Sequence, residues 1–177
     1  SRQYERQVLF SDLVALMAGV ATRTHASVHA AYLAAREQLG VSPAAIYDKL
    51  RRVDPQVTAA LVRETAADAA AVIDALRKSR RTEHSGCAVR TVLKGYEVYY
   101  LDGNHLAATE HRIAELRTTR EGPLPGQTLA LFDAQRELIV ELTPGEDGHA
   151  QERSFLPELL PRLSSGGVLV ADPNFCT

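Results

Sequence analysis

The chain has 177 residues with a net charge of −2; 45% are hydrophobic and 24% charged, which allows a packed core and excludes global disorder. No apolar run reaches the roughly 20 residues of a membrane-spanning helix and no signal-peptide pattern opens the chain, so we expect a cytoplasmic protein without a membrane partner. Cys87 and Cys176 form no CxxC pair, so neither a structural zinc site nor a disulfide framework is indicated.

The small net charge hides an asymmetry between the two halves of the chain. Residues 1–94 carry 14 Lys or Arg and 9 Asp or Glu, a balance of +5, whereas residues 95–177 carry 6 and 13, a balance of −7. A basic half joined to an acidic half suits a DNA-contacting module beside a carboxylate-rich one, although it also suits two ordinary surfaces.

The sequence up to about residue 83 is rich in alanine and has apolar residues at three- and four-residue spacing, a pattern that predicts helices. Ser27 can cap a helix that runs to Leu39, and Gly40 then supplies its stop. Ser42–Pro43, a capping residue before proline at the first helical position, predicts a second helix over 44–53.

These two helices, separated by a short break, have the proportions of a helix-turn-helix. The second helix offers side chains that can contact phosphates or bases of DNA. The candidate DNA-binding residues are Ser42, Tyr47, Lys49, Arg51 and Arg52. A capped helix pair with basic residues is also a common structural motif, and this reading stays open.

Asp54–Pro55 repeats the cap-and-proline pattern and predicts a long helix, which ends in the basic cluster Arg77–Arg81, where cations favour the helix dipole. One face of this helix carries a predicted apolar stripe: Val57, Leu61, Thr65, Ala69, Val72 and Leu76.

From Gly95 onward the pattern changes to strands. Tyr96–Leu101 is aromatic and β-branched, which predicts a strand that ends at Asp102-Gly103, and residues 106–116 have a modest helical period. Two further strands, Thr128–Phe132 and Leu138–Leu142, flank four residues of hairpin length, and Thr143-Pro144-Gly145 is expected to stop the second.

A helix is expected over about residues 149–163, with Pro157 marking a kink or a late start, and a buried-type strand over Val168–Ala171. Its apolar stripe is predicted to be Leu156, Leu159, Leu160 and Leu163. The chain is therefore expected to be α/β (α+β overall), with a helical region over residues 1–90 and a sheet region over 91–177, the boundary falling within 82–94.

The order strand, strand, strand, helix, strand has a consequence for two aspartates. A helical crossover returns the fourth strand parallel to one already in the sheet, and if that neighbour is the first strand, Asp102 and Asp172 meet at one edge. Adjacent carboxylates repel each other, so such a pair favours a bound cation. Carboxylates are hard oxygen ligands, and an open site of this kind favours Mg²⁺ or Mn²⁺. The alternative is that each aspartate only makes a turn, by bonding nearby backbone.

Several segments resemble the conserved stretches of DDE-type insertion-sequence transposases and follow one another in the same order along the chain. Tyr100–Leu106 with Thr109–Arg112 is similar to their first catalytic-aspartate segment, and Ala171–Thr177 is similar to their second. The intervening stretches that agree are Leu124–Gln127 and Glu146–Ser154, and the region from Val41–Pro43 to Leu50 agrees more loosely.

The resemblance implies an incomplete ribonuclease-H-like mixed sheet in which Asp102 and Asp172 are catalytic residues and the first two ligands of Mg²⁺ or Mn²⁺. It also implies DNA, at the terminal repeats of an insertion element, as the partner, with a homodimer in a synaptic complex and a nucleoid-associated location. The reaction implied is metal-dependent strand cleavage and joining.

Two departures from the family pattern bear on activity. Pro173 stands where the family usually has arginine after the second aspartate, and this chain offers no candidate for the third acidic ligand, a glutamate on a later helix. We expect a fragment or truncated product that is inactive in transposition by itself. Glu146, Asp147, His149 and Glu152 could substitute for that ligand, but a polar loop and a first-turn acid are the simpler interpretation. For His105 and His111, surface or supporting roles are expected.

Three other readings stay open at this point. The chain could be a non-catalytic DNA-binding or regulatory protein derived from a transposase, a metal-dependent nuclease of the same fold, or a degenerate remnant that does not fold.

Overall fold

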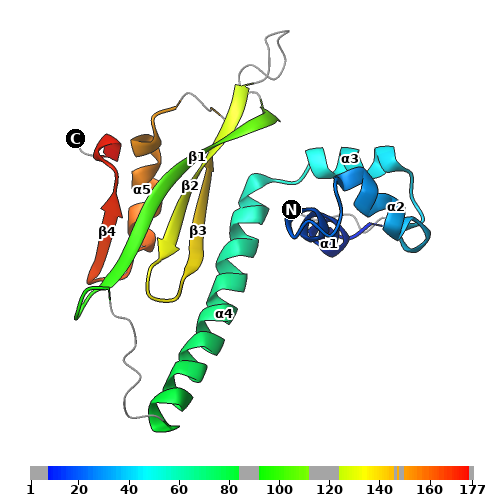
Figure 1. Cartoon of the computed structure of the whole chain (residues 1–177). Coiled ribbons are helices and arrows are strands. Elements are labelled where there is room, and N and C mark those ends of the chain that lie inside the picture. Colours follow the sequence, from blue (N-terminus) through cyan, green and yellow to red (C-terminus); the bar gives the residue numbers. More distant parts are fainter. Residues whose placement is uncertain (1–7, 84–91, 112–123, 146, 148–149, 176–177) are drawn as a thin grey trace. The chain divides into compact units, whose positions relative to one another are not determined.

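The computed structural model describes residues 8–83, 92–111, 124–145, 147 and 150–175. These residues form a mixed α/β protein with a four-stranded sheet, and Figure 1 shows how its helices and strands are arranged within each unit. The chain divides into two compact units, Ser1–Asp54 and Pro55–Thr177. The division falls before the long helix α4 (Pro55–Glu83), earlier than the composition suggested, because α4 packs along strand β3 (Leu138–Gly145). Cys87 and Cys176 lie outside the described residues.

The first unit contains α1 (Phe10–Ala21), α2 (Val28–Leu39) and α3 (Pro43–Arg51). The predicted ends of α2 and the predicted start of α3 are confirmed, whereas α3 ends at Arg51 and not at Val53. The Ser27 hydroxyl accepts a hydrogen bond from the backbone N–H of Ala30 at 3.1 Å, and Gly40 ends α2 in the left-handed conformation with φ of 61°. Ser42 caps α3 in the same way, accepting from Ala45 at 3.3 Å.

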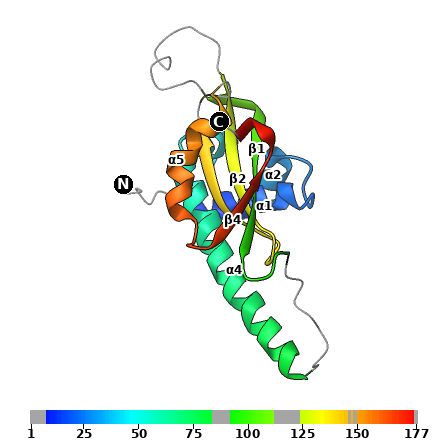
Figure 2. The same cartoon turned by 90° about the vertical axis from the view of Figure 1, so that its left-hand side faces the viewer.

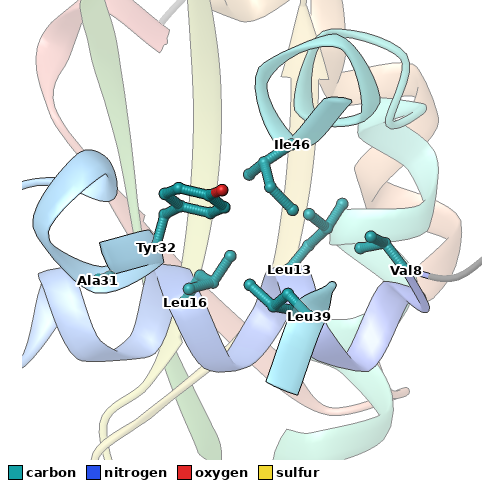
Figure 3. Close-up of a cluster of buried hydrophobic side chains, with 7 residues drawn as sticks. All are labelled: Val8, Leu13, Leu16, Ala31, Tyr32, Leu39 and Ile46. Carbon is teal, nitrogen blue, oxygen red and sulfur yellow. The ribbon is translucent and has the colours of Figure 1, made fainter. Parts of the chain in front are cut away.

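A single apolar cluster holds the three helices together, and Figure 3 shows its side chains. Ile46 of α3 is fully buried in it, at 0% exposure. The hydroxyl of Tyr32, also buried, donates a hydrogen bond to the carbonyl oxygen of Val41 at 2.7 Å, which ties the turn before α3 to α2. The buried members of the cluster are Val8, Leu13, Leu16, Ala31, Tyr32, Leu39 and Ile46.

In the second unit, the prediction for the buried face of α4 is wrong. Val72 and Leu76 of the expected stripe are 58% and 60% exposed, whereas Ala59 and Ala66 are buried. The small alanine side chains allow close approach of the helix to β3. Apolar periodicity misled because an alanine-rich helix offers more than one face that can be buried.

Polar contacts fasten α4 to the sheet. Arg77 donates to the backbone carbonyl of Gln135 at 2.6 Å, and Arg136 in the same β2–β3 turn forms an ion pair with Asp74 at 2.9 Å. The hydrogen bond from the Arg136 guanidinium lowers the pKa of Asp74 below its usual value. Closer to the start of the helix, Arg63 pairs with Glu141 of β3 at 2.8 Å.

The sheet has the strand order β3-β2-β1-β4, built from β1 (Glu97–His111), β2 (Leu124–Asp133), β3 and β4 (Gly167–Ala171). Strands β1, β2 and β3 form an antiparallel meander, and β4 returns parallel to β1. The expectation that the fourth strand returns parallel to a strand already in the sheet is confirmed, and that neighbour is β1.

Strand ends were predicted less well than strand order. β1 does not end at Asp102-Gly103 but continues to His111, so residues 106–111 are strand where a helix was expected, and 112–116 lie outside the described residues. The reason is pairing: the register with β2 continues from Tyr99 opposite Asp133 to Leu106 opposite Gly126. β3 likewise runs through Thr143-Pro144-Gly145 instead of stopping there.

The predicted helix before β4 is present as three joined turns: η2 (Glu152–Phe155), α5 (Leu156–Leu159) and η3 (Leu160–Arg162). Pro157 and Pro161 each stand in the first turn of a segment, where proline needs no N–H partner. Leu159 is fully buried against the sheet, but Leu160 is 48% exposed and does not belong to the stripe. Figure 2 shows α5 against one side of the strands.

None of the helices in the described part of the chain is long and apolar enough to span a membrane.

Candidate functional site

The register between β1 and β4 decides where the two candidate aspartates lie. Its last pair is Leu101 opposite Ala171, so Asp102 follows within β1 and Asp172 comes directly after the end of β4. Both aspartates are exposed. The structure therefore brings the two predicted site residues to matching positions along β1 and β4, at the point where β4 ends.

Side chains alternate along β1, so Asp102 shares a face with Tyr100 and not with the buried Leu101. On that face Tyr100 stacks on Phe132 of β2, with ring centroids 6.3 Å apart. Tyr100 and Val170 are 42% and 44% exposed. The helical turns of residues 152–162 pack on the other face, where Leu159 meets Leu101. Within the described residues of the second unit, the aspartate-bearing face is therefore accessible at Tyr100, Asp102 and Val170.

Asp172 also makes a turn, as the alternative reading proposed. Its Oδ1 accepts a hydrogen bond from the backbone N–H of Asn174 at 2.8 Å, and its Oδ2 accepts one from the side-chain amide of the same residue at 3.0 Å. The turn is η4 (Pro173–Phe175). Asp102 differs, because it lies inside a continuous strand. A turn role thus describes Asp172 and does not describe Asp102.

In the described part of the chain, no third candidate metal ligand is found beside this pair. Among the described residues, no group of three or more His, Cys, Asp or Glu side chains could hold a metal ion. The Glu152 carboxylate lies directly against Gly103, so that a Cβ on that glycine would overlap it. Since Gly103 and Asp102 face opposite sides of β1, Glu152 lies on the face opposite Asp102. Glu146 and His149 lie outside the described residues, as do the side chains of His105 and His111.

The candidate DNA-binding residues do not form one face of α3. Tyr47 and Arg51 are one turn apart and exposed, whereas Lys49 is two residues from Tyr47, about 200° around the helix, and only half-exposed. The Ser42 hydroxyl is used as the helix cap. Arg52 forms an exposed ion pair with Asp48 at 2.9 Å. Tyr47 and Arg51 are therefore the pair that α3 presents together to solvent.

Sequence reasoning missed Asn174 as a partner of Asp172. The pattern Asp-Pro-Asn contains the signal that could have found it, because an aspartate commonly accepts a hydrogen bond from the backbone two residues later. Nothing in the residue pattern indicates the second bond, from the side chain of Asn174, since that bond requires a tight turn after β4.

No protein-family model, curated protein or solved structure matches this chain.

Proposed function

We propose that this chain is part of a DDE-type transposase, in which Asp102 and Asp172 bind a divalent metal ion for phosphoryl transfer on DNA. The observation that carries the proposal is the parallel register of β1 and β4, whose last pair, Leu101 opposite Ala171, directly precedes the two aspartates. The strand order β3-β2-β1-β4 supports it further, because the resemblance implies a ribonuclease-H-like sheet whose fourth strand lies beside the first.

The chemistry of the two side chains fits Mg²⁺ or Mn²⁺. Both donors are exposed carboxylates, the hard oxygen ligands that these ions prefer, and a cation between them would offset their repulsion. When bound, such an ion supplies Lewis acidity, which activates an attacking water or hydroxyl and stabilises the leaving oxygen of a phosphodiester. The contribution of the chain itself is to hold one carboxylate within β1 and the other directly after the neighbouring strand β4, both of them exposed.

Metal titration of the full chain tests this site. The variants Asp102→Asn and Asp172→Asn are each expected to lower the affinity for Mn²⁺ by about tenfold or more, because each removes one of two anionic ligands. Asp68→Asn, which changes an exposed aspartate of α4, is the matched control and should bind as the unmodified chain does. Calorimetry or the paramagnetic signal of free Mn²⁺ measures the affinity. Equal binding by all four proteins would refute the metal site.

A second candidate function is DNA binding without catalysis, as in a regulatory protein derived from a transposase. The observation that favours it is the arrangement of α2 and α3, in which Tyr32 ties the intervening turn and Tyr47 and Arg51 stand exposed on the second helix. This arrangement is what a helix-turn-helix needs in order to offer one helix to the major groove.

Charge reversal on α3 tests this function separately from the metal site. Arg51→Glu is expected to weaken binding to a short DNA duplex of mixed sequence and to reduce the slope of log affinity against log salt concentration by about one, the loss of one phosphate contact. Arg23→Glu makes the same charge change in the same unit, outside the helices, and serves as the control. Fluorescence anisotropy over a salt series measures both. Equal losses in the two variants would mean that net charge, and not α3, governs binding.

A further inference from the structure

Both carboxylate oxygens of Asp172 are held by one residue, Asn174. The backbone N–H of Asn174 donates to Oδ1 at 2.8 Å, and its side-chain Nδ2 donates to Oδ2 at 3.0 Å. The N–H of Phe175 donates to the Asp172 carbonyl at 3.2 Å and closes the same turn. Two bonds to different oxygens fix the rotation of the carboxylate plane as well as its position.

The turn that presents Asn174 is itself anchored. Phe175 packs against the apolar cluster between the sheet and α5, and η4 also contacts η2. Pro173 has a fixed φ near −65°, which favours the tight turn that brings Asn174 back to Asp172. The proline that departs from the family pattern therefore helps to build the clamp, by which we mean the two hydrogen bonds from Asn174 to the Asp172 carboxylate.

The comparison with Asp102 shows that the clamp depends on the turn and not on the residue pattern. Asn104 follows Asp102 at the same two-residue spacing, but it lies in extended β1, opposite Thr128 of β2. An extended chain cannot return its amide to the residue two positions earlier, because alternate side chains of a strand stand nearly 7 Å apart.

A clamped carboxylate keeps room for a ligand. An ionised aspartate has about four lone-pair sites on its two oxygens, and Asn174 uses one on each. The remaining sites are open to solvent, since Asp172 is exposed. Outer residues that hydrogen-bond a ligating carboxylate fix its orientation, which reduces the cost of ordering it when a metal binds.

We propose that Asn174 is a positioning residue: its side-chain amide holds the Asp172 carboxylate in one orientation beside Asp102 and thereby strengthens binding of a divalent cation. The inference rests on the proposed function of the aspartate pair. It assigns to Asn174 a role in metal affinity that is separate from any role in folding, because its side chain is exposed and near the end of the described sheet unit.

The test compares Mn²⁺ affinity and thermal stability in the full chain. Asn174→Ala keeps the backbone bond to Oδ1 and removes the bond to Oδ2, so we expect about a tenfold loss of Mn²⁺ affinity with an unchanged melting temperature. Asn104→Ala removes the corresponding amide after Asp102 and should leave the affinity unchanged. Asp172→Asn provides the reference for complete loss of the ligand.

The outcomes separate the two proposals. If Asn174→Ala binds Mn²⁺ as the unmodified chain does while Asp172→Asn does not, the positioning role is wrong and the metal site stands. A loss of affinity that comes with a matching fall in melting temperature, or an equal loss in Asn104→Ala, also overturns the positioning role. If Asp102→Asn and Asp172→Asn both bind normally, the metal site fails and the role of Asn174 fails with it.

Discussion

Truncation of Leu159 to alanine is expected to lower the free energy of unfolding of the sheet-bearing unit by about 2–5 kcal/mol, the range for leucine-to-alanine changes at buried sites. Leu159 is 0% exposed and packs with Leu101, Leu129 and Leu131 on one face of the sheet. The helical segment that carries it is only three short turns, so it has little freedom to move inward and fill the cavity.

Leu160→Ala is the matched control for this prediction. Leu160 is the next residue in the chain but is 48% exposed, so the same truncation should cost less than about 1 kcal/mol. Urea denaturation followed by circular dichroism measures both variants. Similar losses at the two positions would mean that the packing of residues 152–162 on the sheet differs from the arrangement described above.

The parts of this fold that could be predicted from the sequence are those set by neighbouring residues. Ser27 and Ser42 cap their helices because a hydroxyl can reach a backbone N–H three residues later, and this chemistry is visible in the pattern itself. Gly40 ends α2 for an equally local reason, the left-handed conformation that glycine tolerates. The order of the four strands and of the helical segment before the last of them followed from turn-forming residues of the same local kind.

Features that depend on distant partners could not be predicted in the same way. The length of β1 is set by pairing with β2, in which Gly126 lies opposite Leu106 although it comes 20 positions later in the chain. The local helical periodicity of residues 106–116 gives no indication of that pairing. Which face of α4 is buried depends on the surface of β3 against which the helix packs. Alanines at 59 and 66 are as suitable for close contact as valine and leucine are for a broader interface, so apolar periodicity alone chose the wrong side.

The candidate site shows the same division. That Asp102 and Asp172 should lie on neighbouring strands followed from the element order together with the resemblance, and the register agrees with it. Their different environments did not follow, because one lies within a long strand and the other in a turn. The charged and aromatic residues predicted to contact DNA from α3 were chosen by residue type alone. Helical geometry places Lys49 and Tyr47 on different sides of that helix.

The second large effect concerns Glu141, a buried carboxylate on β3. It is the shared partner of two arginines, Arg63 of α4 and Arg162 of η3, each 2.8 Å from Oε1. The Glu141 side chain is 4% exposed, whereas the arginine side chains are 40% and 34% exposed. The arginines can therefore regain water when the pair is broken, but the carboxylate cannot. Loss of both cations should consequently cost much more than loss of the anion.

Replacing both arginines by methionine is expected to destabilise the sheet-bearing unit by about 3–5 kcal/mol at neutral pH, since it leaves a buried charge without a partner. Glu141→Gln alone should cost only about 1 kcal/mol, because both arginines stay hydrated. The decisive variant combines the three changes. Neutralising Glu141 in the double-methionine background should restore most of the lost stability, as measured by urea denaturation. If the triple variant is no more stable than the double one, the loss comes from missing arginine packing and not from the stranded charge, and the ion pairs are not what fastens α4 and η3 to β3.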